Sequence, residues 1–70
     1  MIEIEIKYGA KVTDMNGKVL GTVDHLVYNI LNGEITKFIV RRKVSADLIL
    51  APEDVLEVID TKIRLKIAIK

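Results

Sequence analysis

Residues 16–43, NGKVLGTVDHLVYNILNGEITKFIVRRK, contain the pattern from which the rest of the chain can be placed. Two Asn-Gly pairs, at 16–17 and 32–33, enclose a long apolar run, and a second apolar run follows. Asn-Gly is a strong hairpin signal because a type I′ turn requires positive φ at both central residues. The sequence therefore predicts a strand over about 18–31, a tight turn, and a return strand over 34–42.

The long strand changes phase near its middle. Alternation places Val19 and Val23 on one face and Leu26 on the other, so an extra residue must lie near positions 24–25. An extra residue in one strand produces a β-bulge, which bends the strand. Gly21, which has no side chain, suits a close backbone approach or a barrel corner.

Shorter elements are predicted on both sides of this hairpin. The predicted strands cover residues 2–7, 11–14, 47–50, 56–59 and 62–70. Pro52 followed by two acidic residues predicts one helical turn over 52–55, because Pro suits the first helical position and acids suit a helix N-terminus. No amphipathic helix is available to cover a sheet, so the sheet must pack on itself. We expect one all-β domain over residues 1–70, a small closed or partly open β-barrel of about six strands.

Composition limits the class of protein. The chain has 70 residues, no cysteine, a net charge of +1, and 50% hydrophobic residues that are mainly Ile, Val and Leu. These numbers favour strands, exclude disulfides and thiolate metal sites, and argue against a polyanion binder driven by overall charge. No charged-then-apolar leader and no apolar run of membrane-spanning length is present, which predicts a soluble cytoplasmic protein. The absence of Cys, Trp and Gln beside many Ile, Lys and Glu residues is typical of thermophiles.

Residues 9–23, GAKVTDMNGKVLGTV, resemble the opening of PRC-barrel domains. That opening often has a Val and an Asp, a short turn with Gly, and then a hydrophobic-Gly-x-Val step. The remainder is also similar: a turn with Gly33, a strand at 38–40, and an apolar-Ala-Pro step within 50–55. The resemblance covers residues 9–65, and the order and spacing of short motifs carry it.

The resemblance implies a small β-barrel that works through protein–protein contact. Members of the family include a cytoplasmic domain of the photosynthetic reaction centre H subunit and the C-terminal domain of a ribosome-maturation factor. Short stand-alone forms occur in archaea and bacteria, and some archaeal forms are linked to cell division. The family has no shared catalytic residue to carry over. We therefore expect a non-enzymatic interaction module or adaptor for an unidentified protein partner, with no cofactor.

Few residues are candidates for catalysis or metal binding, and the sequence pattern favours structural roles for each of them. His25 could pair with Asp24 or Asp47, but catalysis also needs a pocket or nucleophile, and a metal site needs three or four ligands. The acids at 14 and 53–54 fit turn and helix-start positions, and the distal Glu of a calcium loop is absent. We predict no catalytic, cofactor-binding or metal-binding residue.

One basic cluster supports an alternative function. Its members are Lys37, Arg41, Arg42 and Lys43. Such a patch could serve an RNA- or ribosome-associated factor or dock a protein partner. Single-strand binding usually adds stacking aromatics, and only Tyr8, Tyr28 and Phe38 are available. Nucleic acid is therefore the second hypothesis, and membrane insertion is not expected.

The two ends of the chain predict self-association. Both alternate Ile with charged residues, acidic at the N-terminus and basic at the C-terminus. Opposite charges facing each other across paired strands contribute roughly 0.2–1 kcal/mol per pair. The candidate strand residues are Ile2, Glu3, Ile4, Glu5, Ile6, Arg64, Lys66, Ile67 and Ile69. Pairing within one chain would close the barrel, and pairing between chains would build a homodimer, which a thin 70-residue core favours.

Overall fold

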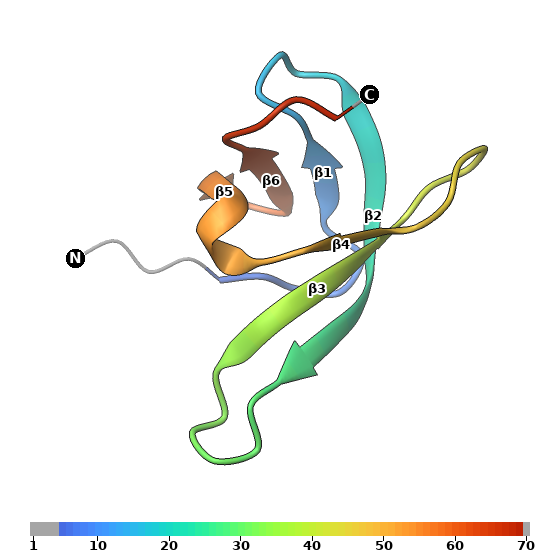
Figure 1. The fold of residues 1–70 in the computed structure, drawn as a ribbon. Coiled ribbons are helices and arrows are strands. Elements are labelled where there is room, and N and C mark those ends of the chain that lie inside the picture. Colours follow the sequence, from blue (N-terminus) through green and yellow to red (C-terminus); the bar gives the residue numbers. More distant parts are fainter. Residues whose placement is uncertain (1–4, 70) are drawn as a thin grey trace.

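The computed structural model describes residues 5–69, which form one curled sheet of six strands and a single 3-10 turn (Figure 1). The elements in chain order are β1 (Lys11–Thr13), β2 (Val19–Tyr28), β3 (Ile35–Arg41), β4 (Leu48–Leu50), η1 (Pro52–Asp54), β5 (Val55–Ile59) and β6 (Lys62–Leu65). The sheet curls into a half-barrel, which confirms the all-β, partly open barrel and the helical turn after β4.

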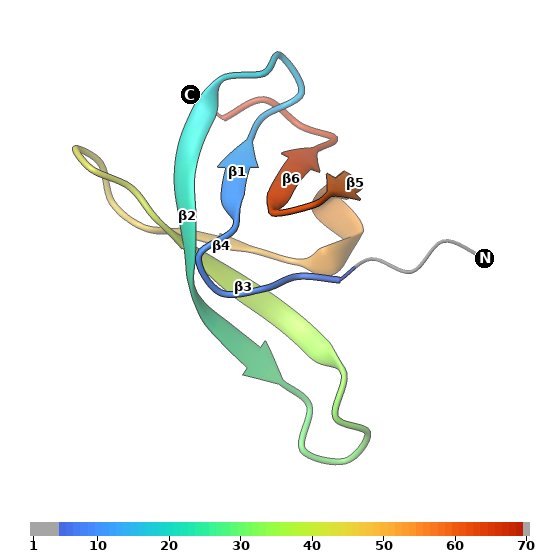
Figure 2. The same cartoon turned by 180° about the vertical axis from the view of Figure 1, so that it is seen from behind.

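The strand order is β4-β3-β2-β1-β6-β5. All neighbouring pairs are antiparallel except β1 and β6, which pair in parallel. Among the described residues β4 and β5 are the two edges of the sheet, and η1 connects them along the chain (Figure 2). The half-barrel is therefore bridged at its open side by a turn instead of a strand pair.

The long hairpin is confirmed, but its turn is not type I′. β2 and β3 pair from Thr22↔Arg41 to Tyr28↔Ile35, and a six-residue connection over 29–34 joins them. Gly33 alone in this connection has positive φ, at 71°, whereas type I′ requires two such residues. Backbone hydrogen bonds close the loop around residues 29–34 instead, and the amide oxygens of two asparagines accept backbone N–H groups.

The other Asn-Gly pair also lies in a longer turn. The Gly17 N–H donates to the Asp14 carbonyl at 3.1 Å, so Met15 and Asn16 are the central residues. The Asp14 side chain is 2% exposed, and one carboxylate oxygen accepts the N–H groups of Asn16 at 2.8 Å and Lys18 at 2.9 Å. The expected turn-forming role of Asp14 is confirmed.

The predicted bulge lies where the sequence placed it. The partners of β2 step from Val23↔Val40 to His25↔Ile39, which leaves Asp24 as the extra residue. Further register shifts occur between β1 and β2 and between β5 and β6. Each bulge bends its strand, and together they curl a six-stranded sheet.

Gly21 allows β2 and β3 to approach closely, as predicted. A Cβ at this position would collide with the carbonyl oxygen and carbon of Arg41 and would lie 3.2 Å from a methyl group of Val40. The corner of the half-barrel near the start of β2 therefore depends on a residue without a side chain.

Both predicted terminal strands need correction. Residues 2–4 lie outside the described part of the chain, and residues 5–7 belong to no strand. Ile6 is nevertheless buried in the core. At the other end β6 stops at Leu65, because the backbone beyond it bonds elsewhere: the Lys66 N–H donates to the Asp54 carbonyl, and the Met15 N–H donates to the Ile67 carbonyl.

The core lies on the concave face of the curled sheet. Its buried side chains are Ile6, Ala10, Val12, Leu20, Val23, Phe38, Val40, Leu50, Val55, Ile63 and Leu65. Every strand contributes to this set, and Phe38 is the largest fully buried side chain. The part of the chain that the structure describes contains no candidate for a membrane-spanning helix.

Candidate functional site

The far end of the β2–β3 hairpin is the most distinctive surface of the molecule. We call residues 27–37 the distal ribbon. Val27, Tyr28, Ile30 and Leu31 are all exposed there, with Ile30 and Leu31 at 96% and 92%. Figures 1 and 2 both show this end projecting away from the rest of the sheet. Four large exposed apolar side chains within residues 27–31 make this tip a candidate contact surface.

The strand pairing explains why the distal ribbon is exposed. β1 pairs with β2 only over residues 19–22, and β4 pairs with β3 only over residues 38–40. Within the described chain, Val27 and Tyr28 therefore pair only with residues 35–37 of β3. A Thr36 hydroxyl donates to the Val27 carbonyl at 3.2 Å, which adds one further bond across the ribbon.

The sequence pattern predicts a strand up to residue 31 and does not mark the distal ribbon as a surface. A signal was present nevertheless. Ile30 and Leu31 are consecutive apolar residues directly before an Asn-Gly pair. Turn positions are usually polar, so two large apolar side chains there are candidates for a contact surface.

The structure divides the predicted basic cluster. Lys37 and Arg41 lie on the outer face of β3, four residues apart with Ile39 between them, which corresponds to roughly 13 Å along a strand. Arg42 and Lys43 follow β3 and line a hollow with Lys18, which precedes β2. Lys18 was not part of the predicted cluster, because it lies 24 positions before Arg42 in the sequence.

The predicted dimer strands are only partly described, and the described part has a different environment. Ile2, Glu3 and Ile4 lie outside the described residues. Glu5 forms an exposed ion pair with Lys7 at 3.7 Å. β6 lies between β1 and β5, so its backbone edges are occupied on both sides.

In the predicted basic strand, Arg64 forms a hydrogen bond within its own chain. The Arg64 guanidinium donates to the Met15 carbonyl at 3.0 Å. Ile67 is exposed and Ile69 packs against the core, both beyond the end of β6. Whether these residues serve a homodimer stays a prediction.

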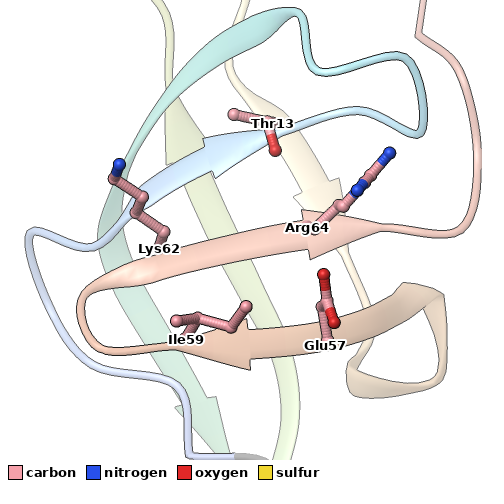
Figure 3. Close-up of a pocket in the computed structure, with 5 residues that line it drawn as sticks. All are labelled: Thr13, Glu57, Ile59, Lys62 and Arg64. Atoms are coloured by element: carbon pink, nitrogen blue, oxygen red, sulfur yellow. The ribbon is translucent and has the colours of Figure 1, made fainter.

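A shallow groove crosses the outer face of β1, β6 and β5 (Figure 3). Its lining residues are Thr13, Glu57, Ile59, Lys62 and Arg64, and its volume is about 280 Å³. Glu57 and Arg64 are register partners, so charges of both signs face the same space. This volume lies just below the usual range for ligand pockets, roughly 300–1,000 Å³. The arrangement is that of a solvated sheet face.

His25 lies at the bulge with its side chain exposed. Its Nδ1 is 2.9 Å from an Asp24 carboxylate oxygen. Within residues 5–69 no group of three or more His, Cys, Asp or Glu side chains could hold a metal ion. The pair therefore has the geometry of a surface contact.

Comparison with known proteins gives no family. No protein-family model matches the chain, and no curated protein matches it. The resemblance to PRC-barrel domains therefore stays a prediction from the sequence motifs.

Proposed function

We propose that this protein is a cytoplasmic, non-enzymatic protein–protein interaction module that associates with a second copy of itself through the distal ribbon. The observation that carries the proposal is the near-complete exposure of Ile30 and Leu31 at the end of a projecting hairpin. The PRC-barrel resemblance supports the same class of function, since that family works through protein contacts.

The energetics of the distal ribbon favour a partner. A two-stranded ribbon is only marginally stable in water, and a third element or a packed face normally supports it. Here Leu26 and Ile35 reach back to the core, whereas the four apolar residues beyond them face solvent. Burying apolar surface contributes about 25 cal/mol per Å², so covering this tip would be favourable.

A second copy fits this surface for two reasons. A two-fold axis places the same patch on both sides of an interface, so an apolar tip meets an apolar tip. The distal ribbon also carries charges of both signs, Glu34 near the turn and Lys37 three residues later. An antiparallel arrangement of two ribbons would set Glu34 of one copy near Lys37 of the other.

A dimer joined in this way has the form of an adaptor. Its two curled bodies would point outward, each with β4 at the edge of its sheet. Ile49, in the middle of β4, is exposed and lies on the outer face beside Ile39. A partner protein could add an extended segment to this edge and cover Ile49, as in strand addition.

The test is the oligomeric state of the protein by sedimentation velocity. We expect the wild-type chain to sediment as a dimer at tens of micromolar, and Ile30→Ser with Leu31→Ser to sediment as a monomer. Val44→Ser is the matched control, because Val44 is also 96% exposed but lies in the β3–β4 connection. A monomeric wild type, or a double variant that stays dimeric, would remove the distal ribbon as the interface.

The alternative function, an RNA- or ribosome-associated factor, stays a prediction. The cations of the basic cluster are divided between the outer face of β3 and the hollow beside Lys18. They therefore do not form a continuous row that could follow the phosphate backbone of RNA. An RNA function predicts affinity that falls steeply with salt and a loss of binding when Lys37, Arg41, Arg42 and Lys43 become Ala.

A further inference from the structure

The hollow beside Lys18 forms where the two strands of the long hairpin separate. Gly21 brings β2 against the backbone of Arg41, and Thr22↔Arg41 is the last partner pair at this end. Beyond that pair the β3–β4 connection turns away from β2, as both views show (Figures 1 and 2). The space left between them is open to solvent and has a volume of about 370 Å³.

The charged residues that line this hollow are all basic, and most of the other lining residues are apolar. Lys18 enters from the β2 side, and Arg42, Lys43 and the hydroxyl-bearing Ser45 enter from the β3–β4 connection. No carboxylate lines it. The ion pairs among the described residues join Lys7 to Glu5 and His25 to Asp24, so none of these three cations takes part in one. The hollow therefore concentrates positive potential, unlike the mixed groove of Figure 3.

Arg42 is the central group of this set. It is half-buried, whereas Lys18 and Lys43 are exposed. No side-chain hydrogen bond or ion pair of Arg42 occurs among the described residues, and none of their buried side-chain nitrogens lacks a partner, so the guanidinium of Arg42 is open to solvent. Its planar fork of N–H groups is thus available, and that fork matches the oxygens of a phosphate in a bidentate manner.

We infer that this hollow binds the phosphate group of a small phosphorylated molecule. Arg42 would hold two phosphate oxygens, Lys18 and Lys43 would supply point charges from opposite sides, and the Ser45 hydroxyl would donate to a further oxygen. The volume lies inside the usual range for small-molecule sites and exceeds the need of a single phosphate. A molecule carrying two linked phosphates would meet cations from both walls at once, from the β2 side and from the β3–β4 connection.

A small anion suits the hollow better than nucleic acid does. Sequence-tolerant strand binding combines cations with aromatic platforms, and no aromatic side chain lines this space. The remaining cations of the basic cluster, Lys37 and Arg41, lie on the outer face of β3. Phosphate binding here is also independent of the distal ribbon, which lies at the opposite end of the hairpin.

The test is a titration of the ¹⁵N-labelled protein with inorganic pyrophosphate at fixed ionic strength, followed by two-dimensional NMR. We expect saturable shifts confined to the amides of residues 18–22 and 41–46. Arg42→Met, which keeps an apolar stem, combined with Lys18→Ser should weaken binding at least tenfold. Lys37→Ser removes the same type of charge outside the hollow and should change affinity less than twofold.

Several results would overturn the inference. Shifts spread evenly over all basic residues, or equal losses in the Lys37→Ser control, would show charge attraction without a site. The absence of saturation would do the same. A single-stranded RNA oligonucleotide that binds more tightly than pyrophosphate, with Lys37 and Arg41 contributing, would replace it with a nucleic-acid surface. Unchanged melting temperatures of the variants would show that folding is intact in each comparison.

Discussion

The two ends of the β2–β3 hairpin share one ladder but have different neighbours. Near Gly21 and Val40 the ladder is flanked by β1 and by β4, and its inner face carries the core. In the distal ribbon the same two strands have no third strand beside them in the described chain, and their large apolar side chains other than Ile35 face solvent. Backbone hydrogen bonds join the two strands at both ends, so they do not distinguish the covered end from the exposed end. Burial does, because removal of apolar surface from water is the dominant favourable term in folding.

The largest contrast is expected between two aromatic residues of the hairpin. Phe38→Ala should lower the free energy of unfolding by about 3–5 kcal/mol, because Phe38 is fully buried and its loss leaves a cavity. Tyr28→Ala in the distal ribbon should cost below about 1 kcal/mol in the monomer. Urea unfolding of both variants measures the difference, and comparable losses would mean that the distal ribbon is packed as tightly as the core.

Substitutions at two glycines distinguish the cost of a steric clash from the cost of an unfavourable backbone conformation. Gly21→Ala should cost about 2–3 kcal/mol, since the new Cβ meets the Arg41 carbonyl and neither backbone can move freely. Gly33→Ala in the distal ribbon meets nothing within 4 Å and carries only the strain of φ at 71°, about 1 kcal/mol. Thermal unfolding of the pair is the measurement. A larger loss at Gly33 than at Gly21 would contradict the close approach of β2 and β3.

The side-chain bonds that hold the turns offer a smaller contrast. Asp14→Ala should cost about 1–3 kcal/mol, because a buried carboxylate oxygen accepts two backbone N–H groups that would lose their partner. Asp14→Asn keeps an acceptor and should lose less. Asn32→Ala removes a single exposed bond to the Glu34 N–H and should cost below about 1 kcal/mol. Chemical denaturation would rank the three, and an Asn32 effect above that of Asp14 would reverse the expected order.

The smallest effect is expected at the tip itself. Ile30→Ser with Leu31→Ser should change the unfolding free energy of the monomer by no more than about 0.5 kcal/mol, as exposed substitutions usually do. The measurement is made at low micromolar concentration, so that dimer formation does not contribute to the measured free energy of unfolding. A loss well above 1 kcal/mol would mean that these side chains contribute to the fold of one chain, and the proposed interface would lose its main support.

The strongest sequence predictions were those with a local physical cause. The phase change near residues 24–25 correctly predicted the bulge. An extra residue shifts every following side chain to the other face of the strand, and only a bulge accommodates that shift. Pro52 with its two acids gave the 3-10 turn, where the Ala51 N–H donates to the Asp54 carboxylate at 3.0 Å. The Asn-Gly pairs gave turns at the right places but of the wrong type, because side-chain and backbone bonds to neighbouring residues favoured longer loops.

The predictions that failed depended on distant parts of the chain. Alternation over residues 62–70 is as regular as in a strand, yet pairing stops at Leu65 because the following backbone bonds to η1 and to the β1–β2 turn. The members of the basic cluster lie close together in sequence, yet β3 ends at Arg41. Lys37 and Arg41 therefore stay on the outer face of the strand, whereas Arg42 and Lys43 belong to the connection that lines the hollow.

Local sequence patterns were enough to predict the class of fold, the long bent hairpin and the turn roles of Asp14 and Pro52. These features follow from alternation, side-chain volume and backbone freedom, which act within a few residues. Two features depend on the arrangement of the whole sheet: which end of the hairpin is covered, and the grouping of Lys18 with Arg42 and Lys43 around one hollow. Both depend on which strands lie side by side, and that choice is made by the burial of the whole core, in which every strand takes part.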